Sequence, residues 1–100
     1  MREKIARFID KYSEKSVFLA QQIEMAEQAI KDAERNEMKG DWEMSLVCLG
    51  VAVKIITATI EAVAPYHEEM RTELVSIYAG IDDATCEVLD RCVCPRVRRS

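Results

Sequence analysis

Apolar and small residues recur near the start of the chain at alternating steps of four and three positions. These positions are Ile5, Ile9, Tyr12, Ser16, Leu19, Ile23, Ala26, Ile30 and Ala33. Such spacing places every member on one face of an α-helix that packs along most of its length. Because the pattern has no slip, we expect one long helix from about Arg2 to Met38. A break near Ser13–Ser16 is the alternative, since either serine could cap a new helix.

A turn and a second helix follow. Gly40 suits the left-handed position after a helix end, and Asp41 suits the N-cap of the next helix. The segment from about Trp42 to Ala64 is apolar on nearly every side. One side carries Leu46, Leu49, Val53, Ile56, Ile60 and Val63, and the others carry Val47, Val51, Ile55 and Ala58. A helix that is hydrophobic all round must be covered all round, so we expect this helix to be central to the fold.

The third predicted helix begins near Pro65, which is tolerated in the first turn of a helix but disrupts a helix interior. Its core positions again alternate by four and three: Met70, Leu74, Ile77, Ile81, Ala84 and Val88. The phase survives Gly80, so we expect this helix to run through that position. A restart with Asp82 or Asp83 as its N-cap is the alternative.

These patterns predict an all-α fold, a three-helix antiparallel bundle formed by residues 1–95. A break near Ser13–Ser16 would make it a four-helix bundle. The periodicity ends after Pro95, so residues 96–100 are expected to form a frayed basic tail. The composition agrees, because 49% hydrophobic residues exclude a disordered chain, and 3 Gly with 2 Pro leave little material for the turns of a β-sandwich.

The location of the protein is inferred from two further features. The first residues carry charges without a continuous apolar run, which excludes a secretory signal of the usual kind. The most apolar stretch, residues 46–60, has Lys54 near its centre, where a membrane-spanning helix strongly disfavours a charge. We therefore expect a buried core helix rather than a membrane span. We also expect a cytoplasmic protein whose four cysteines stay reduced.

Candidate chemistry is sparse. Cys86, Cys92 and Cys94 cluster near the C-terminus, but their spacing is not that of a zinc site, and Cys48 lies on the apolar helix as a packed residue. The one histidine, His67, precedes two glutamates at a helix start, and no catalytic or nucleotide-binding motif is present. We therefore expect no catalytic residues, no metal and no cofactor, and we expect that the protein is not an enzyme. A metal or redox module at the three clustered cysteines is a remaining alternative.

Charge is distributed unevenly along the chain. The 14 Lys and Arg stand against 18 Asp and Glu, a net charge of −4, which argues against direct nucleic-acid binding. Between residues 61 and 90, Arg71 is the one basic residue beside eight carboxylates. The eight are Glu61, Glu68, Glu69, Glu73, Asp82, Asp83, Glu87 and Asp90. Blocks of charge often form a solvated helix face. The sharper interpretation is an acidic surface that docks on a basic surface of a partner protein.

The function expected from these features is non-enzymatic binding of another macromolecule. We predict a small acidic inhibitor or regulator that occupies a basic, nucleic-acid-binding surface of a protein partner. In size, charge and lack of motifs the chain is similar to the small inhibitors of phages and mobile elements, including anti-CRISPR proteins. The alternative is a structural or adaptor homodimer built through the helical seams.

A homodimer is also suggested by the lengths of the predicted helices. At ~1.5 Å per residue the first two helices are roughly 55 Å and 34 Å long, so the first would overhang the bundle. The overhang would expose the stripe formed by Ile5, Phe8, Ile9 and Tyr12. We expect this stripe to be covered by its twin in a symmetric pair. A kink near Ser13–Ser16 that folds residues 1–12 back as a fourth helix, or a foreign partner, would cover it equally well.

Overall fold

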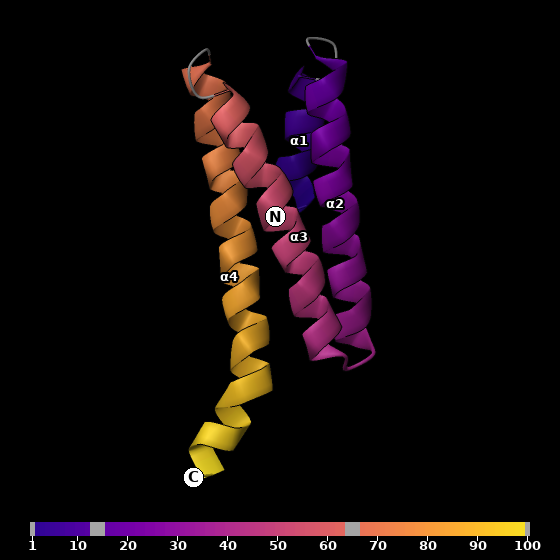
Figure 1. Ribbon diagram of the computed structural model, residues 1–100, viewed down its shortest axis with the longest axis vertical. Helices are drawn as coiled ribbons and strands as arrows, with labels where there is room; N and C mark the ends of the chain where they lie inside the picture. Colours follow the sequence, from indigo (N-terminus) through magenta and orange to yellow (C-terminus); the bar gives the residue numbers. More distant parts are fainter. Residues whose placement is uncertain (1, 13–15, 64–66, 100) are drawn as a thin grey trace.

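The computed structural model describes residues 2–12, 16–63 and 67–99, and the side chains of residues 3–12, 16–63 and 67–91. The described residues form four α-helices and no strand, which confirms the all-α class. The helices are α1 (Arg2–Tyr12), α2 (Val17–Met38), α3 (Trp42–Val63) and α4 (Glu68–Arg99). Successive helices run in opposite directions (Figure 1).

The first predicted helix is divided in two. Helix α1 ends at Tyr12, and Ser16 caps α2 with extended backbone angles (φ −157°, ψ 113°). Its hydroxyl accepts a hydrogen bond of 3.2 Å from the Leu19 amide. The amides of the first helical turn have no backbone carbonyl of the helix to bond, so the serine supplies the acceptor. The preferred single helix from Arg2 to Met38 is therefore replaced by the four-helix alternative. The fold-back is favoured because it buries an apolar stripe that a continuous helix would leave exposed.

The turn between α2 and α3 has the predicted chemistry. Gly40 has a φ of +79°, in the left-handed region that glycine adopts without a Cβ clash. Asp41 Oδ1 accepts a hydrogen bond of 3.1 Å from the Met44 amide and so caps α3. The Asn36 carbonyl accepts bonds from the Lys39 and Asp41 amides, which closes the end of α2. Both predicted turn residues are confirmed.

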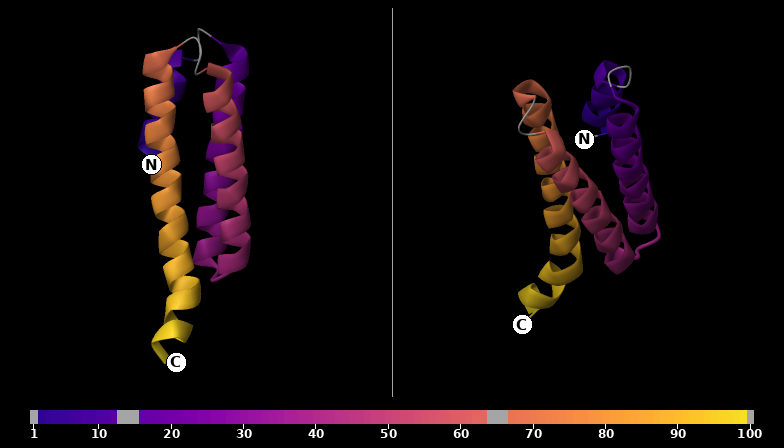
Figure 2. Two further views of the ribbon diagram at one scale, coloured as in Figure 1. Left: turned by 60° about the vertical axis from the view of Figure 1, so that its left-hand side comes forward. Right: turned by 45° about the horizontal axis from the view of Figure 1, so that its top comes forward.

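Helix α1 lies against α2 and α4, on the opposite side of the bundle from α3 (Figures 1 and 2). The two flanking helices are farther apart at the end where α1 is inserted and approach each other toward the α2–α3 turn (Figure 1). Large side chains fill the wide end, including the fully buried Ile5 and the nearly buried Phe8 and Tyr12. Small buried residues of α2 and α3 permit close packing elsewhere: Ala26, Ala29, Ala33, Ser45 and Ala52. The bundle thus has four helices at one end and three at the other.

Helix α3 is not covered on every side, which corrects the expectation from its composition. Its core contacts come from Ser45, Leu49, Ala52, Ile56 and Thr59. On the opposite side Val47 is 59% exposed, Val51 is 47% exposed and Ala58 is also exposed, while Ile55 is partly buried. The physical reason is the position of α1. It packs across the bundle from α3, so no described segment covers the outer face of α3.

Helix α4 runs through Gly80 without a restart at Asp82 or Asp83, as preferred from the sequence. In place of the non-helical tail that the sequence predicts for residues 96–100, the helix continues past Pro95 to Arg99. A proline inside a helix lacks the amide hydrogen for its intrahelical bond and bends the backbone. The last turns of α4 bend away from the rest of the helix (Figure 1). The predicted helix start at Pro65 lies outside the described residues.

Candidate protein-binding surface

The predicted acidic residues fall into two groups, of which the first faces α1. Glu69 and Glu73, on the first turns of α4, both accept hydrogen bonds from Lys11 Nζ of α1, at 2.5 Å and 2.9 Å. Hydrogen bonds from Lys11 to Glu69 and then Glu73 raise the pKa of the Lys11 ammonium above its ordinary value. Burial, followed by the nearby Glu73 carboxylate, raises the pKa of Tyr12. These two carboxylates therefore already have a basic partner within the chain.

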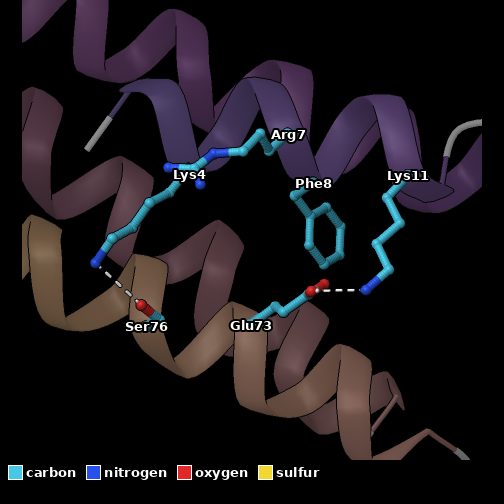
Figure 3. A pocket seen from close by; sticks show the side chains of 6 residues that line it. All are labelled: Lys4, Arg7, Phe8, Lys11, Glu73 and Ser76. Atoms are coloured by element: carbon cyan, nitrogen blue, oxygen red, sulfur yellow. Dashed lines mark hydrogen bonds and ion pairs between the residues drawn. The ribbon is translucent and has the colours of Figure 1, made fainter.

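Basic side chains of α1 continue along this junction (Figure 3). Lys4, Arg7 and Lys11 occur at steps of three and four, so they share a face of α1 and line a cavity of about 470 Å³ between α1 and α4. Lys4 Nζ donates a hydrogen bond of 3.1 Å to Ser76 Oγ. Phe8 points from α1 toward α4 between the two lysines (Figure 3). The cavity thus combines opposite charges, and it does not present an acidic surface.

The second acidic group lies farther along α4. Asp82, Asp83, Glu87 and Asp90 are all exposed, and none of their carboxylates has an ion pair or hydrogen bond with another described side chain. Asp83, Glu87 and Asp90 occur at steps of four and three, which places them in one row on the helix surface. Asp82 lies on the neighbouring strip. This unpaired row, Asp83, Glu87 and Asp90, is called the acidic row below.

The other two predicted carboxylates lie apart from the acidic row. Glu68 is exposed in the first turn of α4, where a negative charge interacts favourably with the helix dipole. Glu61 is exposed on α3, near its C-terminal end. The eight carboxylates that are adjacent in the charge pattern therefore do not form one surface. Among the eight, the acidic row alone forms a continuous strip of carboxylates that are not bonded to other described side chains.

Arg91 of α4 is a structural residue that the sequence analysis did not single out. Its Nη1 lies 3.1 Å from Glu37 Oε1 of α2, and its guanidinium carbon lies 5.8 Å from the centre of the Trp42 ring of α3. Arg91 therefore joins α4 to both other long helices at the three-helix end. Its position three residues after the buried Val88 could have revealed this role, because that step continues the core spacing.

The two described cysteines are free thiols on different helices, α3 and α4. Cys48 is half-buried with Asn36 Nδ2 at 3.9 Å from its sulfur, and Cys86 is exposed. His67 is exposed just before α4. The side chains of Cys92 and Cys94 lie outside the described part of the chain. Within that part, no group of three or more His, Cys, Asp or Glu side chains is placed to hold a metal ion.

The stripe predicted to mediate self-association is covered within the chain. Ile5 is fully buried, Phe8 and Tyr12 are nearly so, and Ile9 packs against the same core. The ring centroids of Phe8 and Tyr12 are 4.7 Å apart. The overhang that motivated self-association here is therefore absent, because α1 folds back beside α2 and α4. Apolar side chains are instead exposed on α3, including Met44, Val47 and Val51.

Helix α3 is the described helix that is long and apolar enough, by length and composition, to cross a membrane. Only 22% of its most apolar window is buried inside the bundle. A single such helix is weak evidence for a membrane span, since core helices of soluble proteins can have the same composition. Lys54 lies within the helix and is exposed.

The described side chains therefore offer two kinds of recognition. The acidic row can attract a positively charged surface, and the outer face of α3 can bury apolar area. The nearest basic and acidic groups, Lys11 with Glu69 and Glu73, bind each other at the α1–α4 junction. Comparisons with protein-family models, curated proteins and solved structures found no match to this chain.

Proposed function

We propose that the protein is a non-enzymatic inhibitor or regulator that binds a basic, nucleic-acid-binding surface of a partner protein through α4. In this proposal it acts in the cytoplasm, without a cofactor. Small inhibitors of phages and mobile elements, including anti-CRISPR proteins, are the class of protein that works in this way. The contact surface is the acidic row, with Asp82 at its edge.

The observation that carries the proposal is the unpaired state of the acidic row. Side chains three and four residues apart on a helix have Cβ atoms about 5–6 Å apart, so the row forms a line of closely spaced negative charges. A surface that binds a nucleic-acid backbone carries basic side chains that pair with a series of closely spaced phosphate charges, and the acidic row offers a similar series of negative charges. Glu69 and Glu73 differ because both already form an ion pair with Lys11. The interaction therefore uses the part of α4 that lies beyond α1.

The experiment compares two charge-reversal variants that change the net charge equally. Asp83→Lys/Glu87→Lys alters the acidic row, and Asp10→Lys/Glu24→Lys alters exposed carboxylates of α1 and α2. Each protein is immobilised and used to capture partners from nuclease-treated extract of the source cells, with identification by mass spectrometry. The captured partner is then tested for binding of a fluorescent duplex oligonucleotide in the presence of each protein.

The expected result is a captured nucleic-acid-binding protein whose oligonucleotide is displaced by the unaltered chain. Displacement is retained by the control variant and is lost with the acidic-row variant. The association rate decreases as salt is added, since exposed charges are screened. Equal displacement by both variants at low salt contradicts the proposal and leaves the acidic row as a solvated face.

A further inference from the structure

The outer face of α3 carries a pattern that the monomer does not explain. The exposed residues Glu43, Val47, Gly50 and Lys54 occur at steps of four, three and four, so they form one strip along the helix. Met44 and Val51 lie beside this strip, and each is 47% exposed. No described segment covers the strip, and it is separate from the acidic row of α4.

The two charges on this strip have opposite signs and symmetric positions. Glu43 and Lys54 are equally distant from the point midway between residues 48 and 49, and so are Val47 and Gly50. Neither charged side chain has an ion-pair partner among the described residues. When a strip of this kind meets a copy of itself in the opposite direction, opposite charges meet at both ends and the apolar residues meet in the centre.

Gly50 supplies an independent observation. Glycine in the middle of a helix destabilises the helix relative to alanine, because glycine loses more backbone freedom on folding. A Cβ atom added to Gly50 would have no heavy atom within 4 Å. Nothing inside the described chain therefore requires the absence of a side chain here. A helix of another molecule that approaches closely at this point would require it.

We infer that a second copy of this chain docks on the outer face of α3, with the two α3 helices antiparallel about a two-fold axis near residues 48 and 49. Glu43 then pairs with the second copy's Lys54, and Val47 packs over its Gly50. Because the axis is two-fold, each of these contacts occurs twice, as an isologous interface requires. Antiparallel packing of this kind matches the small crossing angles of helical bundles. The inference does not depend on the proposed binding of a basic partner, which uses α4.

Sedimentation velocity at micromolar concentrations tests the inference. The unaltered chain is expected to have twice the 11.4 kDa mass of one molecule. Val51→Glu and Gly50→Leu should each weaken the dimer by tenfold or more, through a buried charge and through a steric clash. Val75→Glu is the matched control, because Val75 on α4 is similarly exposed (45%), and it should leave the dimer unchanged. Circular dichroism of each variant checks that the helices are retained.

Charge exchange and cross-linking fix the register. Glu43→Lys and Lys54→Glu should each weaken the dimer, because like charges then face each other, and the combined variant should restore it. Glu61→Lys, outside the pairing, should have no effect. A zero-length carbodiimide cross-link between Lys54 and Glu43 should appear in the dimer band. Within one helix these residues are about 16 Å apart at ~1.5 Å per residue, so such a link joins two molecules.

Three results would overturn the inference. The first is a chain that stays monomeric at high micromolar concentration. The second is a dimer that is insensitive to both Val51→Glu and Gly50→Leu. The third is a monomeric chain that sediments with phosphatidylcholine–phosphatidylglycerol vesicles and loses this binding in Val51→Glu, which would assign the face to a membrane surface.

Discussion

Lys11 and Glu73 are 62 residues apart in the sequence, and Lys11 Nζ lies 2.9 Å from Glu73 Oε1 in the folded chain. The same ammonium group bonds Glu69, so one lysine of α1 holds two carboxylates of α4. Beneath this contact, the nearly buried rings of Phe8 and Tyr12 attach α1 to the core. The charge on Lys11 therefore helps to hold α1 against α4. It also pairs with two carboxylates that would otherwise add to the acidic surface.

Lys11→Met should loosen α1 in a manner that depends on pH. The pKa of Lys11 is raised in the folded chain, so the folded state binds this proton more tightly than the unfolded state does. The resulting stabilisation is complete below the unfolded lysine pKa of about 10.4 and is lost as the pH rises through the folded value. We expect the unfolding temperatures of the two proteins to differ by a constant amount near neutral pH and to converge in the alkaline range.

Lys31→Met serves as the control for this comparison, because the Lys31–Glu27 ion pair of 3.5 Å lies within α2. Amide hydrogen exchange should become faster in α1 of Lys11→Met and should stay unchanged there in Lys31→Met. A difference in stability that persists undiminished at strongly alkaline pH would show that the charge of Lys11 is not the cause.

Ser16→Ala should destabilise the start of α2. The Ser16 hydroxyl accepts the Leu19 amide, and loss of an N-cap of this kind costs about 0.5–2 kcal/mol. The free energy of unfolding, obtained from urea titration, measures the loss. Ser16→Asp should retain most of the stability, since a carboxylate accepts the same bond and favours the positive end of the helix dipole. Equal losses for both substitutions would argue against the capping role.

Ile56→Ala should cost about 2–5 kcal/mol in the free energy of unfolding, because Ile56 of α3 is fully buried and its truncation leaves a cavity. Leu49→Ala, at a site that is 3% exposed, should fall in the same range. Val75→Ala on α4 removes an exposed side chain and should cost about 0.5 kcal/mol or less. A loss below about 1 kcal/mol at both core sites would mean that α3 packs differently from the structure described above.

The helical class, the two turn residues and most of the core could be predicted from the sequence. Periodic positions such as Ile23, Ile30, Leu74 and Ile81 are all buried, because helical spacing places them on one face whatever the neighbouring helix is. The number of helices could not be predicted in the same way. The apolar spacing of α2 continues without a slip from Ser16 to Tyr12 and on through α1, so the spacing alone does not show that the helix is divided there.

The surfaces were harder to predict than the core, because a charge pattern does not show which charges meet across helices. Glu73 and Asp83 look equivalent in the sequence, yet of these two carboxylates Lys11 bonds Glu73 and not Asp83. The exposure of Val51 could not be predicted either. The expectation that this helix is covered all round assumes that every apolar face finds a partner within the chain. Both differences follow from the position of α1, a long-range contact that local spacing does not contain.

Phe8→Ala separates the core role of α1 from a role in assembly. Phe8 is 3% exposed, and truncation of a buried phenylalanine costs about 3–5 kcal/mol, so the free energy of unfolding should decrease strongly. The native fraction should nevertheless keep the mass of the unaltered chain, because the proposed pairing surface lies on the opposite side of the bundle. Val51→Glu should show the reverse, with a lower mass and little loss of stability. Denaturant titration and sedimentation velocity measure the two properties in the same samples. If Phe8→Ala instead lowers the mass and leaves the stability unchanged, α1 contributes its apolar stripe to another molecule rather than to its own core.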